Sequence, residues 1–157
     1  MERVEKCLIC EKHRLVDQDS FLYKSNHWFL YAGPFGSQVL GYIYLEPIRH
    51  VEEWQSFSAD ELEEMTIILP MLEKVLRNIS KLERLYTVTI SEAVRHLHIH
   101  LIPRYQNQEK KGLALIEQAT QQKTDAIEFD RSSYYEFVNH LKREIAVEYS
   151  LVEGKSS

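Results

Sequence analysis

The 157-residue chain lacks long apolar runs and clusters of basic residues. No stretch approaches the roughly 20 apolar residues that span a bilayer, so we expect no membrane association. The N-terminus is charged and leads into no apolar segment, so we expect no signal peptide. Lys and Arg number 19 against 24 Asp and Glu, a formal net charge of −5. Without a basic stripe, binding in the grooves of nucleic acid is disfavoured.

Cysteine is scarce, with two residues in the chain. Because no secretion signal is visible, we expect a cytoplasmic location, where a reducing environment favours thiols or metal ligands over a structural disulfide. The length predicts one domain over residues 1–150, followed by a disordered tail at 151–157.

Five segments have the β-prone composition of strands. They span residues 21–24, 28–32, 39–46, 86–90 and 95–102. The segment 33–37, Gly-Pro-Phe-Gly-Ser, interrupts this pattern and predicts a loop near the functional site.

Two capping boxes mark the expected helices. Ser58 with Glu61 begins the main amphipathic helix, and Ser133 with Glu136 begins a C-terminal helix. A short helix is expected at 113–119. Hairpins come first, then a helix, then paired strands, so we predict an α+β fold. Its antiparallel sheet should have about five strands, packed with the main helix and the C-terminal helix.

Residues 96–100 read His-Leu-His-Ile-His. Side chains alternate between the faces of an extended strand, so His96, His98 and His100 are predicted to share one face. This row has three interpretations: a metal site of three imidazoles, a phosphoryl or nucleotidyl transfer site with a histidine nucleophile, or a solvated polar face. The cost of covering imidazoles without partners disfavours the last.

A second group of side chains suits a metal. Cys7 and Cys10 are spaced so that both sulfurs can reach one zinc ion. His50 and His96 would complete a Cys2His2 shell. The alternative is a buried apolar cysteine pair beside an ordinary loop histidine at position 50.

The segment 96–102 matches every position of the pattern histidine, apolar, histidine, apolar, histidine, apolar, apolar. It therefore resembles the signature of the histidine triad nucleotide hydrolases and transferases. The trailing Pro103-Arg104 and the upstream strand ending in Pro47-Ile-Arg-His50 are also similar to that family. The resemblance covers roughly residues 7–104 and implies the α+β fold of the family and a homodimer.

The resemblance also implies site residues. His98 would attack the α-phosphorus of a purine nucleotide and form a covalent nucleotidyl-histidine, while His100 would assist the leaving group or orient the phosphate. A neutral imidazole is a competent nucleophile near pH 7. The ligands of a structural zinc ion would be Cys7, Cys10, His50 and His96.

The chain departs from the family pattern at several positions. Tyr42 stands where many members carry a histidine, and Glu92 stands in place of a phosphate-binding glutamine. Phe35 offers a ring that could stack on a base or pack in the core. We expect Tyr42, Phe35, Glu92 and Arg104 to bind the nucleotide.

Three hypotheses of function remain open from the sequence. The first is a nucleotide hydrolase or transferase acting through His98. The second is a nucleotide-binding sensor or scaffold with negligible turnover, given Tyr42 and Glu92. The third is a metalloenzyme in which all three histidines of the row hold one catalytic metal.

Overall fold

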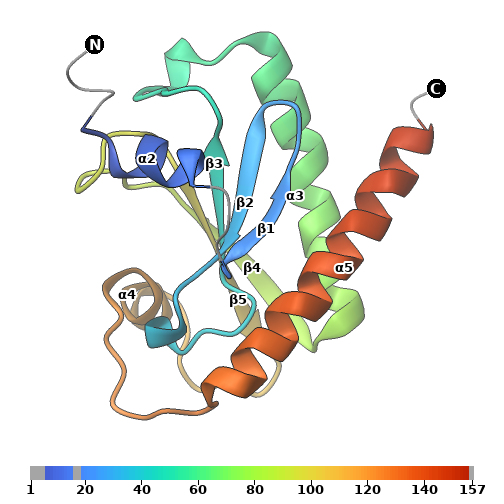
Figure 1. Ribbon diagram of the computed structural model, residues 1–157. Coiled ribbons are helices and arrows are strands. Elements are labelled where there is room, and N and C mark those ends of the chain that lie inside the picture. Colours follow the sequence, from blue (N-terminus) through green and yellow to red (C-terminus); the bar gives the residue numbers. More distant parts are fainter. Residues whose placement is uncertain (1–5, 16–18, 156–157) are drawn as a thin grey trace.

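A five-stranded antiparallel sheet forms the centre of the computed structural model, which describes residues 6–15 and 19–155 (Figure 1). The strands are β1 (Phe21–Lys24), β2 (Trp28–Ala32), β3 (Ile43–Pro47), β4 (Leu82–Val88) and β5 (Ile99–Tyr105). Their order is β1-β2-β3-β5-β4, so β5 lies between β3 and β4. Neighbouring strands are antiparallel throughout. The predicted α+β fold is confirmed.

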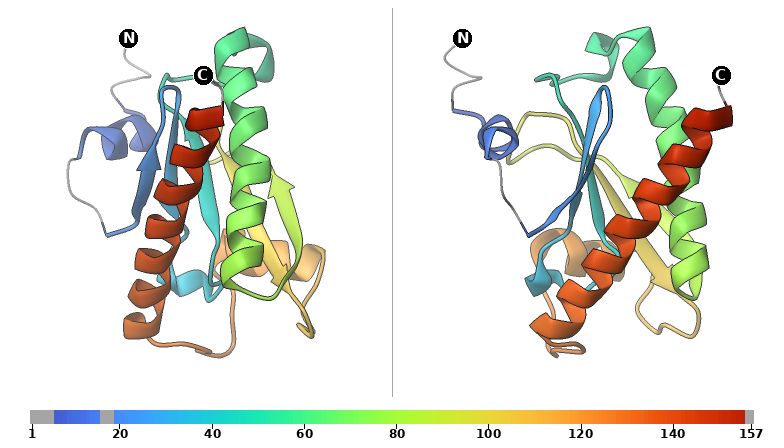
Figure 2. Two further views of the ribbon diagram at one scale, coloured as in Figure 1. Left: turned by 90° about the vertical axis from the view of Figure 1, so that its right-hand side faces the viewer. Right: turned by 45° about the vertical axis from the view of Figure 1, so that its right-hand side comes forward.

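Helices lie on both faces of this sheet (Figure 2). On one face, α3 (Ala59–Ile79) and α5 (Arg131–Lys155) pack against each other and against the strands. On the other face, α2 (Leu8–Arg14) and α4 (Leu113–Gln121) lie at opposite ends. Among the helices of the described residues, none combines the length and the apolar character needed to cross a membrane.

Alternation along β5 separates the core from the functional face. Ile99 and Leu101 enter the large core beneath α3 and α5. Ile102 belongs to a smaller apolar cluster beneath α4, on the opposite face. His100 shares that opposite face because it alternates with Ile99 and Leu101.

Several strand boundaries differ from the sequence-based predictions. The strand expected at 39–46 begins at Ile43, because Gln38 and Gly41 have φ of 54° and 83°, which are incompatible with an extended strand. The strand expected at 86–90 runs over Leu82–Val88, and the strand expected at 95–102 runs over Ile99–Tyr105. Of the histidine row, only His100 therefore lies in a regular strand.

The C-terminal helix also begins and ends elsewhere than predicted. It begins at Arg131, and the Asp130 carboxylate, rather than Ser133, caps it by accepting a 2.8 Å hydrogen bond from the Ser133 amide. It continues to Lys155, so the tail predicted to be disordered is helical over 151–155, and 156–157 lie outside the described residues. The predicted helix at 113–119 corresponds to α4.

The capping box at the start of α3 is confirmed and serves a second purpose. The Ser58 hydroxyl accepts from the Glu61 amide at 3.1 Å, and the Glu61 carboxylate accepts from the Ser58 amide at 2.8 Å. The same carboxylate accepts from the Arg49 guanidinium at 2.7 Å. Because Arg49 precedes His50, this contact ties the loop after β3 to the start of α3.

We expect Glu61→Ala to lower the free energy of unfolding by about 2 kcal/mol, because it removes the carboxylate half of the capping box and leaves the partners of a buried carboxylate unsatisfied. Glu63→Ala, at an exposed position of the same helix, should change it by less than about 0.5 kcal/mol. Urea unfolding measures both. Equal losses of unfolding free energy in the two variants would show that the contacts of the Glu61 carboxylate contribute nothing to stability.

Candidate functional site: a metal centre beside a histidine pair

Four predicted metal ligands come together from three distant segments. Cys7, Cys10, His50 and His96 place one donor atom each so that all four lie within 4.8 Å of one another. The Cys10 sulfur is 3.4 Å from Nδ1 of His50 and 3.5 Å from Nδ1 of His96. The Cys7 sulfur is 3.7 Å from the same His96 nitrogen.

These separations fit tetrahedral zinc. Zinc–sulfur bonds of about 2.3 Å and zinc–nitrogen bonds of about 2.0 Å at tetrahedral angles place sulfur and nitrogen ligands roughly 3.6 Å apart. The three sulfur–nitrogen distances lie around this value. Two thiols and two imidazoles are also the donor set that zinc prefers in structural sites. The cluster can therefore hold a zinc ion.

Hydrogen bonds on the far side of each imidazole prepare its Nδ1 atom for a metal. Nε2 of His96 lies 2.8 Å from the Pro47 carbonyl oxygen, which can only accept, so Nε2 carries the proton and Nδ1 has the lone pair. Nε2 of His50 lies 3.4 Å from a Glu52 carboxylate oxygen, which favours the same tautomer. Such outer partners orient metal-ligating histidines in general.

Burial favours the neutral form of the ligands before a metal binds. It lowers the pKa of His96 to about 4, so this imidazole is unprotonated at neutral pH. Burial, together with the nearby Cys7 thiol, raises the pKa of Cys10 to about 11. A zinc ion would reverse the second effect, because a coordinated thiol loses its proton.

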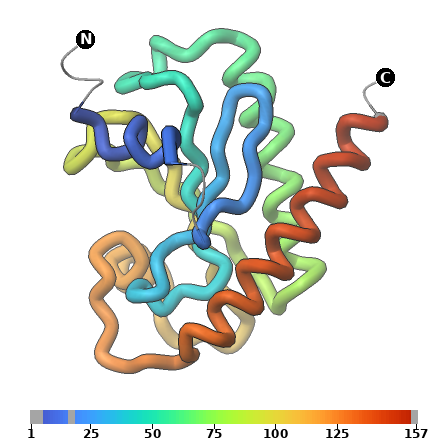
Figure 3. Tube along the Cα trace, viewed as in Figure 1, coloured from blue at the N-terminus to red at the C-terminus, as the bar shows by residue number. Residues whose placement is uncertain are grey.

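Local structure explains how the four ligands meet. Cys7 caps α2, and its sulfur accepts from the Cys10 amide at 3.4 Å, so one helical turn presents both sulfurs. The loop after β3 carries His50, and the segment before β5 carries His96. A 2.7 Å hydrogen bond from the Leu97 amide to the Val51 carbonyl holds these two segments together. Figure 3 shows the N-terminal segment beside the loop that joins β4 to β5.

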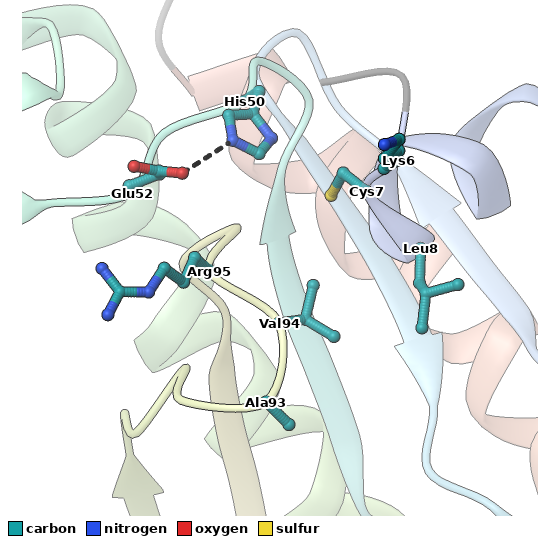
Figure 4. A pocket seen from close by; sticks show the side chains of 8 residues that line it. All are labelled: Lys6, Cys7, Leu8, His50, Glu52, Ala93, Val94 and Arg95. Carbon is teal, nitrogen blue, oxygen red and sulfur yellow. Dashed lines mark hydrogen bonds and ion pairs between the residues drawn. The ribbon is translucent and has the colours of Figure 1, made fainter. Parts of the chain in front are cut away.

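A pocket of about 700 Å³ adjoins this centre (Figure 4). Cys7 and His50 form part of its wall, and the contact between His50 and Glu52 lies at its edge. The remaining lining residues are Lys6, Leu8, Ala93, Val94 and Arg95.

The middle histidine of the row is held with one nitrogen inward. Nδ1 of His98 lies 2.8 Å from the carbonyl oxygen of His96, so Nδ1 donates and Nε2 carries the lone pair. The His98 amide donates to the Ser91 hydroxyl at 3.1 Å. The side chain is half-buried. In the neutral form of His98, Nε2 is therefore the nitrogen that can act as a nucleophile.

The last histidine of the row lies beside it. The rings of His98 and His100 are 4.9 Å apart between centroids and inclined by 63°. His100 is 8% exposed, and its Nδ1 atom is 2.5 Å from the Tyr42 hydroxyl. Burial, and secondarily the charge that His98 can carry, lower the pKa of His100 to about 4. His100 is therefore a neutral imidazole at pH 7.

The row does not form one metal site. Nδ1 of His96 faces the cysteines, whereas Nδ1 of His98 faces a carbonyl oxygen and Nδ1 of His100 faces a hydroxyl. The metal group found among the described residues includes His96 and excludes the other two. This division disfavours the hypothesis of a single metal held by all three histidines.

Three residues expected to bind nucleotide lie apart from the histidine pair or at its margin. Phe35 packs on the helix-side core, with the Arg131 guanidinium 4.5 Å from its ring centre. Arg104 follows His100 by four residues along β5, roughly 13 Å away at the usual rise of a strand. Glu92 is exposed in the loop whose Ser91 contacts His98. Nucleotide binding by these three remains a prediction.

A buried carboxylate beside the site was not predicted. Glu46 is 2% exposed and accepts from Lys12 at 2.7 Å, while Nε2 of His13 lies 3.1 Å away. Burial alone would raise its pKa, but the His13 hydrogen bond and the Lys12 charge hold that pKa below its usual value. These contacts fasten α2 to β3. The feature of the sequence that could have indicated this contact is Glu46 itself, an acidic residue within an otherwise apolar strand.

Comparison with known proteins identifies the family. A family model for the HIT domain matches residues 15–107. The chain belongs to the histidine triad, or HIT, family. No curated protein is significantly similar to it in sequence. This membership supports a function of the nucleotide hydrolase or transferase type.

Solved structures agree on the fold of this HIT protein. A Zn-bound histidine triad family protein from Mycobacterium smegmatis is 15% identical with a TM-score of 0.64, and the match covers 94% of this chain and 99% of that one. A histidine triad nucleotide-binding protein from Sulfolobus tokodaii is 17% identical with a TM-score of 0.62, covering 89% and 92%. At such identities the likeness shows the fold alone.

Zinc content tests the metal centre directly. We expect about one zinc ion per chain in the purified protein, and near none in Cys10→Ser or His50→Ala, because each removes one of four ligands. His100→Asn, which changes a histidine outside the cluster, should retain the ion. Elemental analysis by mass spectrometry measures the zinc content of each protein. Zinc lost from His100→Asn but kept by the cysteine variant would assign the metal to the row instead.

The buried state of His100 predicts a pH effect on stability. Its pKa is about 4 in the folded chain and about 6.5 when unfolded, so the unfolded chain binds more protons between these values. Stability should therefore fall as pH decreases from 6.5 to 4, by up to about 1.4 kcal/mol per pH unit from this residue. His100→Asn should show a flatter decline in urea unfolding across that window. Equal declines of stability with pH in the wild type and in His100→Asn would contradict the conclusion that burial keeps His100 neutral.

Proposed function

We propose that this HIT protein is a nucleotide hydrolase or nucleotidyl transferase acting on the α-phosphorus of a purine nucleotide. The substrate would be a nucleoside phosphoramidate or a dinucleoside polyphosphate. The single observation that carries the proposal is the hydrogen bond from Nδ1 of His98 to the His96 carbonyl oxygen. It leaves the Nε2 lone pair available, beside a second imidazole that can contact phosphate.

The chemistry proceeds in two displacements. The Nε2 lone pair of His98 forms a bond to the α-phosphorus, while the bond from phosphorus to the leaving atom breaks and the leaving group departs with its electron pair. Water, or another acceptor, then attacks phosphorus, and the nitrogen–phosphorus bond breaks and returns its electron pair to His98. Solvent supplies the proton taken up by the leaving group in the first step, and the attacking water releases one proton to solvent in the second. Splitting one difficult displacement into two lowers the barrier of each.

A zinc ion held by Cys7, Cys10, His50 and His96 would help to fix the position of His98. When bound, zinc would supply a structural cross-link, because all four of its sites are occupied by protein ligands. His96 belongs to that centre through its side chain and holds His98 through its backbone carbonyl oxygen. A fixed His96 therefore fixes the orientation of the nucleophile.

The alternative is a nucleotide-binding sensor or scaffold with negligible turnover. Tyr42, at a position where many members of the family have histidine, motivates this second candidate. The homodimer and the cytoplasmic location also stay predictions. The fold is compatible with a dimer in which sheets join, because β4 lies at the outer edge of the sheet.

Turnover of a fluorogenic adenosine phosphoramidate tests the proposal. We expect His98→Ala to lower kcat/KM by more than about 10³-fold, because the variant lacks the nucleophile. His27→Ala, in the hairpin between β1 and β2, is the matched control and should keep full activity. Mass spectrometry of the quenched wild type should show one nucleoside monophosphate attached to the peptide that contains His98.

The outcomes separate the two candidates. An adduct on His98 together with turnover supports the enzyme. Nucleotide binding by calorimetry, with neither turnover nor adduct in the wild type, would reject the enzyme and leave the sensor.

A further inference from the structure

Tyr42 reaches the histidine row through a hydrogen bond to His100, and its ring contacts that of Tyr44, with the centroids 4.9 Å apart. Its side chain is 1% exposed, so it lies beneath the functional surface instead of on it. Its hydroxyl is 2.5 Å from Nδ1 of His100. Direct contact with a nucleotide, which the sequence led us to expect, would require this buried group to reach the surface. The geometry instead lets Tyr42 act through His100.

The direction of the hydrogen bond between Tyr42 and His100 follows from the chemistry of its partners. A phenol is a better donor than acceptor, and an unprotonated imidazole nitrogen is a strong acceptor. Burial also raises the pKa of Tyr42 well above its ordinary value, so the hydroxyl keeps its proton. Tyr42 therefore donates to Nδ1.

Packing prevents Tyr42 from leaving this position. A Cβ atom at Gly33 would overlap the Tyr42 ring, and the Gly33 amide donates to the Tyr42 carbonyl oxygen at 2.7 Å. On the sheet, Tyr42 belongs to the apolar cluster that α4 covers, with Ile102 and Leu115. The ring is thus enclosed from several sides, and phenylalanine would occupy the same space.

We propose that Tyr42 is a positioning residue that holds His100 as the neutral tautomer with its proton on Nε2, so that His100 donates a hydrogen bond to a phosphoryl oxygen during the reaction at His98. A neutral imidazole that accepts at Nδ1 must carry its proton at Nε2. Such a ring stabilises developing negative charge by donation and transfers no proton. The hydrogen bond to a phosphoryl oxygen rests on the proposed function, whereas the tautomer of His100 does not.

The two neighbouring imidazoles are then opposite tautomers. His98 donates at Nδ1 to a carbonyl oxygen and attacks with Nε2, whereas His100 accepts at Nδ1 from a hydroxyl and donates with Nε2. The partner at Nδ1 decides which ring is the nucleophile and which is the donor.

Nitrogen NMR of histidine-labelled protein at pH 7 tests the tautomer without any turnover. In the wild type we expect the His100 signals of an unprotonated Nδ1 and a protonated Nε2. Tyr42→Phe should lose this pattern and show averaged or exchanged nitrogen shifts. Tyr86→Phe is the matched control: its ring packs against the same apolar cluster as Tyr42, but its hydroxyl accepts a hydrogen bond from the Gly112 amide at 2.9 Å. A protonated Nδ1 in the wild type, or an unchanged pattern in Tyr42→Phe, would overturn the proposal.

Kinetics test the catalytic part. Tyr42→Phe should lower kcat/KM by about tenfold, the value of one hydrogen bond of roughly 1.4 kcal/mol, equally for substrates with good and poor leaving groups. A loss confined to poor leaving groups would instead identify His100 as a proton donor and overturn this part. If the wild type shows no turnover, the proposed function fails while the NMR result still decides the tautomer. Thermal unfolding of Tyr42→Phe, expected to stay within a few degrees of wild type, confirms that the variant folds.

Discussion

The buried imidazole of His96 joins the two halves of the site. Its Nε2 atom donates to the Pro47 carbonyl oxygen at the end of β3, and its Nδ1 atom faces the sulfurs of Cys7 and Cys10. Its own carbonyl oxygen accepts from His98. A displacement of His96 would therefore disturb the metal centre and the orientation of His98 together. In the proposed mechanism, this coupling would let a structural ion influence chemistry in which it takes no part.

Hydrogen-bond partners give chemically identical side chains different roles. His96 faces the thiols, His98 is anchored by a carbonyl oxygen, and His100 is anchored by a hydroxyl. Each partner fixes which nitrogen carries the proton, and burial keeps His96 and His100 neutral near pH 7. In the proposed mechanism the three rings serve as ligand, nucleophile and hydrogen-bond donor, although they are neighbours in one short segment.

Local sequence signals predicted the elements that depend on local physics. The strands 21–24 and 28–32 and the Ser58–Glu61 capping box agree with the structure, because turn residues and caps act within a few positions. Boundaries that depend on backbone conformation were wrong. The left-handed Gln38 and the positive φ of Gly41 delay the start of β3, and the cap of α5 is Asp130. The helix α2 was missed, because its seven residues show too little periodicity.

The sequence by itself determined the candidate residues for metal binding and for the proposed chemistry, since the histidine row and the cysteine pair are specific combinations of side chains. It also determined the α+β fold through the order of its elements. Only the tertiary structure decided how the row is divided between a metal centre and the pair of His98 and His100, because the dividing contacts join residues such as Cys7 and His96 that are far apart in the chain. It also assigned a hydrogen-bond partner to Nε2 of His96 and to Nδ1 of His100, since Pro47, Tyr42 and the histidines meet only when β3 and β5 pair.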